Sequence, residues 1–125
     1  MAHPRMYSDK DPYLKELRTV CLALPEAVEI EAWGRPTFRA GEKGKMFAIF
    51  TGLQEPKRYS LIFKPDPEDA AALRADDRFY VAKYYPRDLA LDFTAAEVDW
   101  NEVAELVEGS YRQVANKRQL KLLDG

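Results

Sequence analysis

The pattern of hydrophobic and polar positions changes period along the chain and predicts alternating groups of helices and strands. Between Asp11 and Pro25 the apolar residues recur at spacings of three and four, which is typical of the buried side of an amphipathic helix: Leu14, Leu17, Cys21 and Leu24. The pair Asp11-Pro12 predicts the helix start, because Asp accepts from free amides and Pro suits the first helical position. Pro25 predicts that the helix ends before it.

From residue 27 the period shortens to two and predicts four strands, over residues 28–32, 37–40, 45–51 and 58–64. The third stretch is apolar on both faces, which indicates a central strand that is covered on both sides. Gly41-Glu42-Lys43-Gly44 predicts a tight turn, because glycine adopts the positive φ that tight hairpins need.

The second half predicts a short helix, two strands and a long helix. Asp66-Pro67 repeats the Asp-Pro start, and that helix is expected to end near Asp76-Asp77. Strands are predicted over 79–84 and 89–93, joined by a turn at 85–88, with one wet and one buried face in the last strand. Asp99 with Glu102 predicts a capping box. A single apolar stripe follows to the end of the final helix: Trp100, Val103, Ala104, Val107, Tyr111 and Val114.

These elements give the order α-β-β-β-β-α-β-β-α and predict an α+β fold of two layers, an antiparallel β-sheet packed by helices. Hairpin-length connections in the first half require antiparallel neighbours. The helix after Asp66 lies between two groups of strands, so we expect a split or crossed connection there. A length of 125 residues fits one domain, 1–125, with a flexible tail at 1–10. The order of the strands does not follow from the sequence.

Composition argues against common enzyme classes. Cys21 is the only cysteine and reads as a small buried hydrophobe, and His3, the only histidine, lies in the N-terminal tail. No Ser/His, Cys/His or zinc arrangement can therefore form around them, and we expect no catalytic residue and no cofactor. No run of eighteen apolar residues and no signal-peptide segment is present, so we expect a cytosolic protein.

Charge is distributed unevenly along the chain. Residues 35–64 carry seven Lys or Arg against two Glu, whereas residues 65–110 carry twelve acidic against four basic residues, in a chain of net charge −2. Cations near turns can contact phosphates, so the candidate nucleic-acid-binding residues are Arg39, Lys43, Lys45, Lys57, Arg58, Lys83 and Arg87. Arg35 is expected on the same face. The alternative is that these side chains keep the sheet soluble, since lysines at turns commonly do so.

Two further groups of side chains allow more than one interpretation. Tyr80, Tyr84 and Tyr85 either stack on bases, line a small-molecule pocket or form cross-strand packing pairs. The acidic residues between Asp66 and Asp77 do not have the spacing of a Ca²⁺ loop, and Asp66 and Asp69 are explained by helix capping. We therefore predict no metal site.

Several ordered blocks resemble the MmcQ/YjbR family of small bacterial proteins: CLALPEAVE, GRPTFRAGEKGKMFAIF, SLIFKPDPEDAAAL, RFYVAKYY and VDWNEVAELVEGSYRQVANKRQL. The resemblance implies a compact α+β fold similar to the frataxin-like CyaY fold. It also implies DNA binding through two β-hairpin loops that resemble a double wing, with no catalytic residues and no cofactor. The segment 83–88 departs from the family pattern, in which this turn often contains glycine or His and Trp.

Two functions follow as expectations. The first is a non-enzymatic, monomeric domain that binds double-stranded DNA through its basic hairpin loops. The second is an adaptor that binds a protein or a small ligand on its sheet face and has no role with nucleic acid. An exposed apolar patch or a concave pocket would favour the second function over the first.

Overall fold

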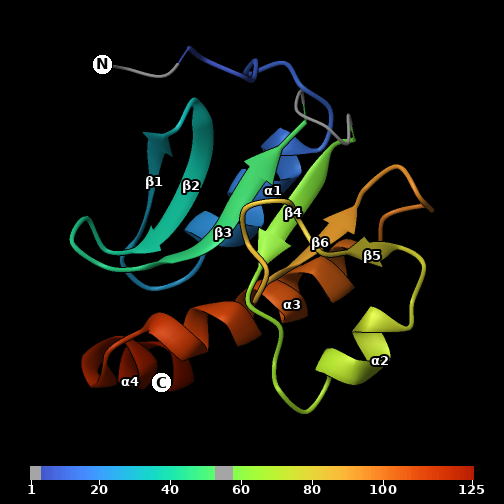
Figure 1. Cartoon of the computed structure of the whole chain (residues 1–125). Helices are drawn as coiled ribbons and strands as arrows, with labels where there is room; N and C mark the ends of the chain where they lie inside the picture. The colour runs from blue at the N-terminus through green and yellow to red at the C-terminus, as the bar shows by residue number, and fades with distance from the viewer. Residues whose placement is uncertain (1–3, 53–57) are drawn as a thin grey trace.

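The computed structural model describes residues 4–52 and 58–125, which form a six-stranded sheet and four helices (Figure 1). All neighbouring strands are antiparallel, in the order β1-β2-β3-β4-β6-β5. The elements along the chain are α1 Leu14–Leu22, β1 Ala27–Ala32, β2 Arg35–Ala40, β3 Met46–Thr51, β4 Ser60–Phe63, α2 Ala70–Arg74, β5 Phe79–Tyr80, β6 Leu89–Asp92, α3 Trp100–Val114 and α4 Lys117–Asp124. This confirms the predicted α+β class.

The main core lies between the sheet and the helices α1 and α3, which Figure 1 shows behind the strands. Val103, Val107 and Tyr111 form the fully buried stripe of α3. The ring of Tyr111 meets that of Phe47 edge to face, with 5.3 Å between centroids. Full burial of each large apolar side chain stabilises the fold by about 1.5–3 kcal/mol. The core therefore fixes α3 across the central strands.

The other face of the sheet is turned toward the viewer in Figure 1, with no helix drawn across β1–β4 on that side. We call it the open face. The strand registers place these described residues on it: Arg35, Thr37, Arg39, Met46, Ile49, Thr51, Ser60, Ile62, Tyr80, Ala90 and Asp92. A small apolar cluster lies at its centre, where Ala82 and Tyr85 pack on Ile49, Ile62 and Ala90.

The connection through α2 is a crossed one, as the sequence predicts: it joins β4 to β5, which are not neighbours in the sheet. β6 pairs with β4, and β5 lies outside β6 at the edge. The chain therefore leaves β4, passes through α2 and forms the edge strand β5. It then returns as β6, which lies between β4 and β5. This order places the start of β3, the end of β4 and the start of β6 at one end of the sheet.

Two predicted helix starts are too early, by two residues for α1 and by three for α2. α1 begins at Leu14 behind Tyr13, which has a left-handed φ of 73°, while Asp11 accepts from the Ser8 amide instead. α2 begins at Ala70, and Asp66 accepts from the amide of Glu68. In both places the Asp side chain closes a local turn, which competes with helix formation.

The final helix is divided in two where one continuous helix was predicted. Ala115 is extended, with ψ 147°, and Asn116 starts α4 with a capping box to Gln119. The bend lets Gln119 donate to the carbonyl of Ala40 at 3.0 Å. Asp99 caps α3 by accepting from the amides of Asn101 and Glu102, but the carboxylate of Glu102 accepts from Arg78, so only half of the predicted capping box is present.

The second strand pair also differs from the prediction. β5 is two residues long rather than six, because the chain leaves the sheet edge at Val81 and passes over the open face. Figure 1 shows this connection in front of β4. As a result β6 is buried on both faces, with Ala90 fully buried, instead of having one wet face.

Candidate ligand-binding site on the open face

A pocket of about 420 Å³ lies on the open face at the end where β3 and β6 start and β4 finishes. Its apolar lining comes from the sheet, chiefly Met46, Ile49 and Ile62. Tyr85, from the β5–β6 connection, supplies an aromatic wall. The described strands and the connection therefore build a concave site from segments far apart in the sequence.

The polar lining of the pocket is mainly cationic. Arg39, Lys45 and Lys64 line it, together with the single carboxylate of Asp88. The Lys64 Nζ lies 3.7 Å from Asp88 Oδ1, and the Nε of Arg39 donates to Thr37 Oγ1 at 3.4 Å. Burial raises the pKa of Asp88 against the opposing effect of Lys64. The lining thus favours a negatively charged ligand.

A buried serine of α3 links the backbones of two strands that line the pocket. Ser110 is fully buried, and its hydroxyl donates to the carbonyl of Phe47 at 2.6 Å. The amide of Lys64 donates to the hydroxyl oxygen of Ser110 at 2.9 Å. Phe47 and Lys64 both line the pocket, so helix packing fixes the backbone of the site.

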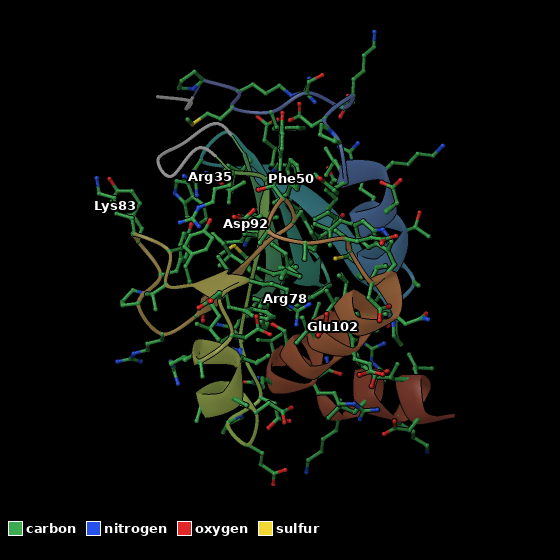
Figure 2. All side chains as sticks on the ribbon, turned by 90° about the vertical axis from the view of Figure 1, so that its right-hand side faces the viewer. Arg35, Phe50, Arg78, Lys83, Asp92 and Glu102 are labelled. Carbon is green, nitrogen blue, oxygen red and sulfur yellow. The ribbon has the colours of Figure 1, made fainter. Side chains whose placement is uncertain are left out.

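The structure brings only part of the predicted nucleic-acid-binding set together. Arg39 and Lys45 line the pocket, and Lys43 is exposed on the adjoining turn. Lys83 and Arg87 are exposed on the β5–β6 connection, where the Lys83 Nζ lies 5.4 Å from the ring centroid of Tyr84. Figure 2 shows Lys83 on the side away from α1 and α3.

Arg58 lies at the other end of β4 and is already engaged. Its guanidinium lies 4.0 Å from the ring centroid of Tyr80 and donates to Asp92 at 3.4 Å. At about 3.3 Å per residue, the six steps from Arg58 to Lys64 separate the two ends of the strand by roughly 20 Å. Lys57 lies outside the described residues. The predicted cations therefore do not form one cluster.

Sequence reasoning did not assign Lys64, Asp88 or Ser110 to the site. Lys64 and Asp88 meet because β6 pairs with β4, a neighbour relation that hydrophobic alternation does not encode. Ser110 interrupts the apolar stripe of α3, and a small polar residue at a core position was the available signal. Tyr85 was considered as a pocket residue, and it lines this pocket.

Two other kinds of site were sought in the described part of the chain. Within residues 4–52 and 58–125, no group of three or more His, Cys, Asp or Glu side chains is arranged to hold a metal ion. None of the helices described there has the length and apolar character needed to cross a membrane.

The fold and the pocket together define a small α+β domain with a ligand-sized hollow on an uncovered sheet face. The YjbR family model matches residues 22–113, and the chain belongs to the YjbR family, whose function is uncharacterised and which is not known as enzymatic. The crystal structure of protein DR2400 from Deinococcus radiodurans, which carries a DUF419 domain, is similar with a TM-score of 0.70. That similarity has 25% sequence identity and covers 89% of this chain and 87% of the other. No curated protein matches the chain.

Proposed function

We propose that this domain is a non-enzymatic binding protein that takes a small anionic molecule with an apolar part in the pocket of the open face. The observation that carries the proposal is the concave shape of the site between Arg39, Lys45 and Lys64. A volume of about 420 Å³ falls in the range of about 300–1,000 Å³ that is usual for small-molecule sites.

The chemistry of the lining supports an amphipathic ligand. Met46, Ile49 and Ile62 offer apolar contact, and the ring of Tyr85 offers a flat wall. Lys45 is exposed and no acid among the described residues pairs with it, so its ammonium is available to a carboxylate, sulfonate or phosphate group. Charge-assisted hydrogen bonds to such groups are the strong polar contacts of ligand sites.

Duplex DNA is the second candidate partner. The observation in its favour is that Lys43 and Lys45 are exposed on the β2–β3 turn, while Arg87 is exposed beside Asp88 on the neighbouring connection. Cations on two adjacent loops could contact successive phosphates. Against this, the cations surround a hollow and Arg58 is paired elsewhere, whereas a winged reader needs a projecting ridge.

One pair of matched variants separates the two candidates. Lys45 lines the pocket, whereas Lys43, two residues away on the same turn, does not. Anilinonaphthalene sulfonate is a suitable probe, because it combines aromatic rings with a permanently ionised sulfonate and fluoresces in apolar sites. We expect Lys45→Met to weaken its binding about five- to tenfold and Lys43→Met to leave it unchanged.

The same variants are tested with duplex DNA by fluorescence anisotropy at about 50 mM salt, where phosphate contacts are strongest. Micromolar DNA binding that falls equally in Lys43→Met and Lys45→Met would establish the DNA function and displace the ligand proposal. Near-ultraviolet circular dichroism of each variant confirms that the sulfonate reports a folded pocket, because this dye also binds partly unfolded chains.

A further inference from the structure

Arg35, a buried arginine at the start of β2, has no side-chain partner among residues 4–52 and 58–125. Arg35 is 7% exposed, and its Nε is buried without a hydrogen bond. Within the described residues its side chain makes no hydrogen bond, ion pair or aromatic contact. A guanidinium does not lose its proton in proteins, so Arg35 carries a positive charge that no described side chain offsets.

Such a charge is unfavourable for the fold alone. A buried ion needs an opposite charge or several hydrogen bonds to offset its desolvation. Two half-buried arginines of the chain do have such partners: Arg18 pairs with Glu29 at 2.7 Å and Arg78 pairs with Glu102 at 2.7 Å. An unsatisfied buried group needs a specific explanation, and a bound ion is one of them.

On the two strands next to β2 on this side, the described residues level with Arg35 carry hydroxyl groups rather than carboxylates. The antiparallel register of β2 with β3, carried two residues beyond Thr37 and Ile49, places Thr51 across from Arg35. Thr51 is half-buried, and its hydroxyl makes no hydrogen bond in the described part of the chain. Ser60 follows on the next strand.

The nearest acid along the same row, Asp92, is already engaged. Its carboxylate accepts from Arg58 at 3.4 Å and from both the amide and the hydroxyl of Thr94, at 2.8 and 2.6 Å. Figure 2 shows Arg35 on the side of the sheet away from α1 and α3, opposite to the direction of Phe50. The charge of Arg35 therefore belongs to the open face.

We propose that Arg35, with the hydroxyl of Thr51, forms a second anion-binding subsite on the open face, for a phosphate or carboxylate group. The guanidinium would donate to the anion, and Thr51 would supply a neutral donor from the adjacent strand. The subsite is separate from the pocket, since four residues of β2 place Arg35 roughly 13 Å from Arg39. It does not depend on the function proposed for the pocket.

The test follows the Arg35 Nε–H signal in nitrogen–proton correlation NMR spectra of the whole chain. Inorganic phosphate replaces chloride at constant ionic strength, and a second series uses acetate. We expect saturable shifts of the Arg35 Nε–H and the Thr51 amide that give one dissociation constant. An Arg35 signal that moves with neither anion would overturn the proposal.

Variants separate binding from a structural role. Arg35→Met removes the charge but keeps a long apolar chain, so we expect loss of the Thr51 shift and a melting temperature in chloride equal to or above that of the wild type. A clearly lower melting temperature in chloride would show that the fold itself needs the guanidinium, and would contradict the proposal. Arg74→Met is the matched control, because Arg74 is exposed on α2, and it should retain the shifts. Lys45→Met should retain them as well, even if the pocket binds nothing.

Discussion

The replacement Ser110→Ala tests the link between helix packing and the pocket. The serine hydroxyl is fully buried and joins the carbonyl of Phe47 to the amide of Lys64, at 2.6 and 2.9 Å. Alanine fits the space but leaves both backbone groups without that partner. An unsatisfied buried group costs about 1–3 kcal/mol, and the carbonyl, which has a second lone pair, falls at the lower end. We therefore expect a loss of about 2–3 kcal/mol.

Urea unfolding followed by circular dichroism measures this change directly. For a domain of this size the loss corresponds to a fall in melting temperature of roughly 10 °C. Ser8→Ala is the matched control, since Ser8 is exposed and its hydroxyl makes only a local hydrogen bond with the Lys10 amide, so it should change stability by less than about 0.5 kcal/mol. A Ser110→Ala protein as stable as the control would refute the reasoning.

Three further predictions concern an ion pair beside the edge strand β5, the charge of the pocket and the turn between β2 and β3. Arg78→Met breaks the paired contact with Glu102 at 2.7 and 3.0 Å and should lower the free energy of unfolding by about 1–2 kcal/mol in urea titrations, more at low than at high salt. Burial raises the pKa of Asp88, so its carboxylate is protonated at a higher pH than an exposed one as pH falls. Protonation removes the negative charge from the pocket, so the affinity for the sulfonate should rise below that pKa. Asp88→Asn should bind the sulfonate more tightly at neutral pH and lose this pH dependence in fluorescence titrations. Gly44→Ala places a Cβ 2.0 Å from the Ala40 carbonyl, so the turn must shift, and calorimetry should show weaker sulfonate binding with a lowered melting temperature.

Most of the fold follows from local patterns in the sequence. The apolar stretch 45–51 predicts a covered central strand, and β3 is central. The alternation in 58–64 predicts that neighbouring side chains lie on opposite faces, and Leu61 and Ile62 do belong to the two separate apolar clusters. The helical spacing of Val103 and Val107 likewise predicts the buried side of α3. Period alone identifies these elements because each side chain packs within its own layer.

The pocket could not be predicted in the same way. It depends on β6 entering between β4 and β5, and on the β5–β6 connection folding over the sheet. The segment 79–84 has the composition of a strand, but its Ala82 and the following Tyr85 gain more from packing on Ile62 than from lengthening an edge strand. Tertiary contact overrides local propensity at this point. The sequence therefore identified the candidate basic residues, but it did not predict which of them lie together in the structure.

The most direct test of the ligand-binding proposal is a map of where an amphipathic anion binds. Nitrogen–proton NMR spectra of the protein are recorded while anilinonaphthalene sulfonate is added at neutral pH. The proposal predicts that the largest amide shifts fall on Met46, Ile62 and Tyr85, around the pocket, and that Lys45→Met reduces them together. Shifts confined to the exposed turn at Lys43, or scattered over both faces of the sheet, would contradict it.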